Sequence, residues 1–119
     1  EVVVVAHPAL GIDSISKRDL TRIFLKQRTR WSTGVNAKPI DQPMKSELRA
    51  SFCGEVLNRS LADVESYWNG RVFSGKGTPP PTAKTDAEVL DFVRSTPGAV
   101  GYVTGDANTS GVQLIAIID

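Results

Sequence analysis

Hydrophobic positions along the chain form continuous runs in some places and helical repeats in others. Val2–Ala6 is an unbroken, β-branched run, which is typical of a strand covered on both faces. A first helix is predicted near residues 17–25, where Ser16 is a good N-cap and apolar residues recur at helical spacing. A turn-rich connection then leads to a short strand predicted around residues 38–41.

The middle of the chain predicts two more helices and a loop. Pro43 fits the first turn of a helix, because its missing N–H costs nothing there. Apolar residues continue that helix from Leu48 to Leu57. Ser60 caps the next helix. Residues 69–84, which contain three consecutive prolines, are predicted to form a long loop.

The last third carries the clearest helix and two strands. Thr85 and Glu88 form a capping box, and Pro97–Gly98 ends the helix. Residues 99–105 and 112–118 are predicted strands joined by a polar turn. The resulting order, β-α-β-α-α-loop-α-β-β, predicts an α/β fold. We expect residues 1–119 to form a single three-layer domain, with a mixed sheet flanked by helices.

Composition and charge narrow the classes of function. The 119 residues are 40% hydrophobic and 23% charged, so the chain can bury one core. A net charge of +1 gives no electrostatic footprint for nucleic acid, and we expect no such partner. No apolar run approaches the roughly 20 residues that span a bilayer. The opening "EVVVVAHP" lacks a basic leader, so a signal peptide was either never present or already removed.

The motifs of common enzymes and metal sites are weak in this sequence. The segment "GRVFSGKG" (Gly70–Gly77) resembles a phosphate-binding loop, but three prolines follow where that loop needs a helix. No spacing of Cys, His or carboxylates suggests a metal site, and no cofactor is expected. A small hydrolase using His7 and Asp41 would need both side chains within hydrogen-bond reach. We therefore expect a non-enzymatic protein.

The stretch "PIDQPMKSELRASF" is the best candidate for chemistry. A helix start exposes free N–H groups with a partial positive charge, and anions bind there. Lys45 and Ser46 fall in the predicted first turn and Arg49 one turn later, whereas Asp41 would repel an anion unless it accepts a proton-bearing oxygen. An ordinary capped helix is the alternative interpretation, and spacing leaves both open.

Three segments in order carry a family resemblance: "SISKRDLTRIFLKQRTRW", "PIDQPMKSELRASF" and "STPGAVGYV". Together they resemble the second half of periplasmic phosphate-binding proteins of ABC transporters, members of the type 2 periplasmic binding protein superfamily. The first matches a family segment of the type L-S-x-x-E-L-x-x-I-F-L-G-K-x-x-x-W, and the last matches T-P-G-A-I-G-Y-V. The resemblance implies a fold like one lobe of such a protein.

The middle segment departs from the family's R-x-D-G-S-G-T phosphate-binding turn. If Phe52 is aligned with the family's helix phenylalanine, Ser46 falls on the motif's serine. The other positions differ: Lys45 and Glu47 replace the two glycines, Leu48 replaces the threonine, and Gln42 replaces the arginine.

The resemblance implies a solute-binding-like protein similar to the phosphate ABC transporter substrate-binding component. It would bind phosphate or another small anion at a helix N-terminus, in the periplasm, with its signal peptide absent from this sequence. The expected ligand-binding residues are Ser46, Gln42, Lys45, Asp41 and Arg49. The resemblance suggests three possible partners: an ABC transporter permease, another protein, or a second copy of the chain. The alternative is a non-catalytic interaction or accessory module that has lost phosphate binding.

Overall fold

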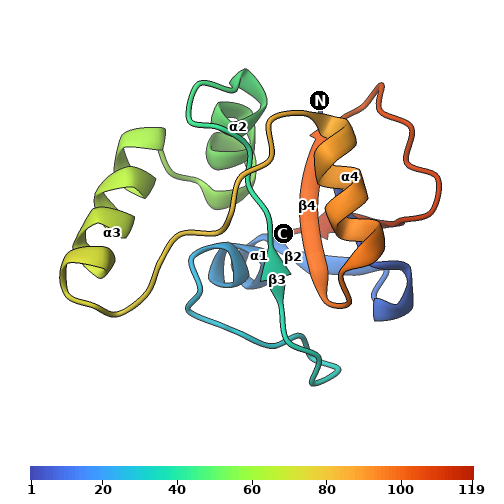
Figure 1. The fold of residues 1–119 in the computed structure, drawn as a ribbon, viewed down its shortest axis with the longest axis horizontal. Helices are drawn as coiled ribbons and strands as arrows, with labels where there is room; N and C mark the ends of the chain where they lie inside the picture. Colours follow the sequence, from blue (N-terminus) through green and yellow to red (C-terminus); the bar gives the residue numbers. More distant parts are fainter.

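A curled, five-stranded mixed sheet forms the centre of the computed structural model, which describes all 119 residues (Figure 1). The strands are β1 (Val2–Ala6), β2 (Ser14–Ser16), β3 (Lys38–Pro39), β4 (Ala99–Thr104) and β5 (Gln113–Ile118), in the spatial order β2-β5-β1-β4-β3. β1 pairs antiparallel with β4 and β5, whereas β2 and β3 run parallel to their neighbours β5 and β4. The predicted α/β class is therefore confirmed.

Helices cover both faces of this sheet. The helical elements of the chain are the 3-10 turn η1 (Pro8–Leu10), α1 (Lys17–Phe24), α2 (Glu47–Phe52), the π-helix η2 (Cys53–Leu57), α3 (Leu61–Phe73) and α4 (Asp86–Ser95). Of these, α1, α2 and η2 pack on one face of the sheet and α4 packs on the other. The predicted caps are confirmed. The side-chain oxygens of Ser16, Ser60 and Thr85 each accept a hydrogen bond from the backbone N–H three residues later, at 3.1–3.2 Å.

Two predicted boundaries are wrong. The helix assigned to Pro43 begins at Glu47 instead, because Ser46 takes the N-cap position and accepts from Arg49 N at 3.2 Å. Pro43 starts a tight turn, closed by a 2.9 Å bond from Ser46 N to the Pro43 carbonyl. The loop predicted to begin at residue 69 begins after Phe73, where α3 ends.

The core lies on both sides of β1, as its continuous apolar run predicted. Val4 and Ala6 belong to a larger cluster that includes side chains of α1, α2 and η2. Val5 belongs to a second cluster with side chains of α4. In the larger cluster Phe52 stacks on Tyr102, with ring centroids 4.0 Å apart and planes 6° from parallel. This stack fixes α2 over β4.

α3 projects away from the sheet, at the far side of the molecule from α4 (Figure 1). Trp68 anchors it in the larger cluster, and the Tyr67 hydroxyl donates to the Leu25 carbonyl at 2.7 Å. Gly70–Phe73, the first half of the segment resembling a phosphate-binding loop, is helical. None of the helices has both the length and the apolar character needed to cross a bilayer.

Candidate functional site

Polar side chains converge where β3 and β4 end. Because these strands are parallel, their carboxyl ends meet at one edge of the sheet, the usual place for ligands in α/β folds. The residues gathered there, called the polar cluster below, are Asp41, Gln42, Ser46, Arg49, Asp86 and Tyr102. Two backbone bonds hold Asp41 in place: Asp41 N donates to the Pro81 carbonyl at 2.8 Å, and Ala83 N donates to the Asp41 carbonyl at 2.9 Å.

Asp41 is the centre of the polar cluster. Its Oδ1 accepts from the Tyr102 hydroxyl and from Gln42 N, the latter at 2.9 Å. Its Oδ2 lies 3.6 Å from Arg49 Nη2. Burial raises the pKa of the Asp41 carboxyl, because lost hydration outweighs the Arg49 charge and the hydrogen bonds. Burial, with the neighbouring carboxylate, also raises the pKa of Tyr102.

Gln42 links this centre to the start of α4. Its Nε2 donates to Asp86 Oδ1 and to the Tyr102 carbonyl, both at 3.0 Å. Asp86 Oδ2 in turn accepts from the Thr104 backbone at 3.2 Å and hydroxyl at 2.7 Å. Arg49 Nη1 donates to the Gln42 carbonyl at 2.8 Å. Gln42 and Arg49 are two side chains of the cluster that could donate hydrogen bonds to an oxyanion. Most of their polar groups are therefore already bonded within the protein.

The expected ligand residues divide into four that meet and one that stands apart. Asp41, Gln42, Ser46 and Arg49 are in mutual contact, and Ser46 Oγ makes a long 3.4 Å bond to Gln42 Oε1. Lys45 is exposed and forms neither a hydrogen bond nor an ion pair. Among the five expected ligand side chains, only the Lys45 ammonium and the half-buried Ser46 hydroxyl can reach an ion at the surface.

The turn before α2 offers unused backbone donors. The N–H groups of Met44, Lys45, Glu47 and Leu48 have no acceptor in the chain, whereas those of Ser46 and Arg49 do. Met44, Lys45 and Glu47 are exposed. We call residues 44–48 the amide turn. It can donate to a surface oxyanion, but the exposed Glu47 carboxylate sits beside it and opposes negative charge.

Two members of the polar cluster were missed as site residues. The ring of Tyr102 lies in the larger hydrophobic cluster, but its hydroxyl reaches Asp41. Asp86 lies in the first turn of α4, where an acidic residue is ordinary. No local signal marks either residue, since both contacts join residues more than 40 positions apart.

The hydrolase arrangement is absent. His7 Nδ1 caps η1 by accepting from Ala9 N at 3.1 Å, and no hydrogen bond joins His7 to Asp41. Cys53 is buried, and burial raises the pKa of its thiol, so it is not an activated nucleophile. No group of three His, Cys, Asp or Glu side chains is placed to hold a metal ion.

Comparison with solved structures gives the fold a clear set of relatives. PstS from Borrelia burgdorferi matches with a TM-score of 0.75 and 17% identity, over 98% of this chain and 46% of its own. An ABC-type phosphate transport receptor from Vibrio cholerae matches with a TM-score of 0.77 and 15% identity, over 98% of this chain and 45% of its own. A protein of Clostridium perfringens assigned as a phosphate ABC transporter substrate-binding protein, solved with bound phosphate, matches with a TM-score of 0.77 and 12% identity over 98% and 44%.

These likenesses show a shared fold, that of a lobe of phosphate-binding proteins. The chain spans less than half the length of the solved proteins it matches. No protein-family model matches the sequence, and no curated protein matches it either. The relatives are substrate-binding proteins rather than enzymes.

Proposed function

We propose that residues 1–119 form one solute-binding-type domain that binds phosphate or another small oxyanion at the amide turn. Its fold is that of a lobe of phosphate transport receptors, and four of the five expected ligand residues meet beside the turn. The observation that carries the proposal is the set of four N–H groups there without an acceptor in the chain. With such relatives, we further propose that the domain works in the periplasm with an ABC transporter or a related protein partner.

The proposed affinity is low, for an electrostatic reason. The charges of Asp41 and Arg49 cancel each other inside the polar cluster, so Arg49 contributes little net attraction. Lys45 attracts an anion and Glu47 repels it, both through high-dielectric solvent. The backbone N–H groups remain as the main source of binding, and we expect a dissociation constant of about 1 mM, worth roughly 4 kcal/mol.

Thermal unfolding in different anions tests this proposal. Phosphate or sulfate at about ten times the dissociation constant should stabilise the protein by roughly 1.4 kcal/mol over chloride at equal ionic strength. Lys45→Gln should reduce this gain, whereas Lys84→Gln, which removes an exposed ammonium group that forms no hydrogen bond or ion pair, should leave it unchanged. Equal stability in all three anions would reject oxyanion binding.

The second candidate is an interaction or accessory module without an anion ligand. The internal bonding of the polar cluster favours it, because Asp41 and Gln42 have their partners within the protein, and of the buried side-chain atoms of the cluster only Arg49 Nε lacks one. Val72 and Phe73, which are 51% and 95% exposed at the end of α3, together form an apolar surface that also favours contact with another protein. This candidate predicts no response to any anion at the amide turn.

Under either candidate function, a protein partner could cover the amide turn, as the second lobe of a two-lobed binding protein would. A partner lying over the amide turn would exclude water and strengthen each N–H bond to an oxyanion. A permease, another protein or a second copy of the chain could serve. If the domain pairs with itself around the ion, sedimentation should show a dimer whose population rises with phosphate. A mass that phosphate does not change would reject self-association around the ion.

A further inference from the structure

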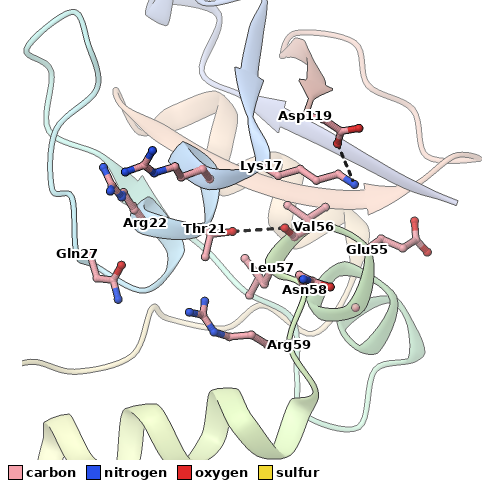
Figure 2. A pocket seen from close by; sticks show the side chains of 12 residues that line it. Lys17, Thr21, Arg22, Gln27, Glu55, Val56, Leu57, Asn58, Arg59 and Asp119 are labelled. Atoms are coloured by element: carbon pink, nitrogen blue, oxygen red, sulfur yellow. Dashed lines mark hydrogen bonds and ion pairs between the residues drawn. The ribbon is translucent and has the colours of Figure 1, made fainter.

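A wide cleft lies between α1 and η2, and none of the residues that line it belongs to the amide turn (Figure 2). Its volume is about 990 Å³. The ionisable side chains that line it are Lys17, Arg18, Arg22, Arg59, Glu55 and Asp119. Four of these six are cations, so basic charge is concentrated here in a chain whose net charge is only +1.

The guanidinium groups of this cleft have no partners in the protein. Lys17 Nζ lies 3.2 Å from Asp119 Oδ1, and that pair neutralises itself. Arg18, Arg22 and Arg59 form neither an ion pair nor a side-chain hydrogen bond. Three unpaired cations against the single carboxylate of Glu55 leave the cleft with a net charge of +2. Such a cleft attracts ligands that carry two or more negative charges.

The backbone around the cleft is unusual at three points. Lys26 and Asn58 are the two non-glycine residues with positive φ, at 56° and 55°. They directly precede Gln27 and Arg59, which both line the cleft. Residues of η2 form one wall, and π-helical turns are rare and occur frequently at functional sites. Asn58 is the left-handed C-cap of η2, and its conformation sets the direction in which the chain continues into Arg59.

Figure 2 shows how these turns direct the side chains. Arg59 extends from the turn after η2 toward the side of the cleft on which Arg22 and Gln27 lie. The Thr21 hydroxyl donates to the Val56 carbonyl at 3.4 Å and closes the floor between the two walls. Glu55 and Asp119 lie on the opposite side. One side of the cleft is therefore cationic and carries free donors.

We propose that this cleft binds an inorganic oligophosphate, either diphosphate or a longer chain. Guanidinium groups match phosphate oxygens with two parallel hydrogen bonds, and several can act on successive phosphates. A volume of about 990 Å³ exceeds what one orthophosphate fills. No aromatic side chain lines the cleft, so a nucleobase would find no ring to stack on. This site is distinct from the amide turn, and its existence does not depend on the proposed function.

Titration calorimetry of the whole chain with diphosphate and tripolyphosphate tests the proposal. Arg22→Gln/Arg59→Gln should weaken binding of both ligands by about tenfold or more. The matched control, Arg30→Gln/Lys84→Gln, removes two exposed cations that do not line the cleft, and should change the affinity by less than about twofold. An equal loss in both double variants would overturn the site, as would the absence of heat from the wild type at about 5 mM ligand.

Amide NMR of the wild type gives a second readout that needs no variant. Diphosphate should shift the resonances of Gln27, Gly54 and Asn58, which line the cleft. Shifts confined to residues 44–48 would overturn the cleft site while supporting the amide turn. Conversely, cleft shifts with diphosphate and no shifts at residues 44–48 with orthophosphate would support this site and reject the proposed function.

Discussion

Arg49 Nη2 lies 3.6 Å from Asp41 Oδ2, and both side chains are less than a tenth exposed. Taking two charges out of water costs about as much as their attraction returns, so such a pair adds little net stability. Each partner nevertheless requires the other, because removing one leaves a buried charge uncompensated. The pair therefore fixes the turn between β3 and α2 and cancels the charge that an oxyanion site would use.

Replacing Arg49 should lower the stability of the folded protein substantially. Arg49→Met leaves Asp41 buried without its cation and should lower the free energy of unfolding by about 3–5 kcal/mol. Urea unfolding measures the change. Lys17→Met is the control, because it breaks the exposed pair with Asp119 and should cost less than about 1 kcal/mol. Equal losses of unfolding free energy in the two variants would show that the buried pair contributes no more to stability than the exposed pair does.

The stability contributed by Asp41 should depend on pH with a definite sign. Its pKa is raised above 3.8 in the folded protein, chiefly by burial. The folded state then holds the proton more tightly than the unfolded state. The stabilisation from the protonated Asp41 carboxyl is complete below the pKa of the unfolded state. It is lost as pH rises through the raised pKa of the folded state. The wild type should therefore lose unfolding free energy relative to Asp41→Asn as pH rises above about 4. A relative gain over that range would contradict the raised pKa.

Tyr102→Phe should separate the hydroxyl from the ring. The stack on Phe52 is retained, but Asp41 Oδ1 loses one of its two donors, and we expect a loss of about 1–3 kcal/mol. Tyr67→Phe removes a hydroxyl bond to the Leu25 carbonyl at a half-buried position and should cost less. Chemical denaturation of both variants decides the order. A larger loss at Tyr67 would mean that the Tyr102 hydroxyl contributes little to the polar cluster.

Gly98 should not tolerate a side chain. Its φ is +84°, and a Cβ there would collide with the carbonyl oxygen of Asn36. Gly98→Ala should therefore destabilise the protein by more than about 2 kcal/mol. Gly54→Ala is the control, since a Cβ at that helical position meets nothing within 4 Å and should be neutral or stabilising by about 0.5–1 kcal/mol. Thermal unfolding of the two variants provides the comparison, and a neutral Gly98→Ala would contradict the close approach.

Local signals in the sequence were enough to predict four of the five strands and most helices, whereas the three-residue edge strand β2 (Ser14–Ser16) was not predicted. Ser16, Ser60 and Thr85 act on the backbone three residues away, so their caps could be predicted from spacing alone. The helix does not start at Pro43 because Ser46 caps α2 instead, and Pro43 takes the first position of a turn, where only its carbonyl is used and its missing N–H costs nothing. The polar cluster could not be predicted in full, because Gln42 meets Asp86 across 44 positions of the chain.

A two-dimensional amide NMR titration with orthophosphate tests oxyanion binding at the amide turn most directly. The resonances of Met44, Lys45, Glu47 and Leu48 should shift and saturate, because their N–H groups have no acceptor in the chain. The same concentration of chloride should leave them in place. If none of these four resonances moves at about 20 mM phosphate, the domain does not bind oxyanions at this turn, and the interaction module becomes the better description.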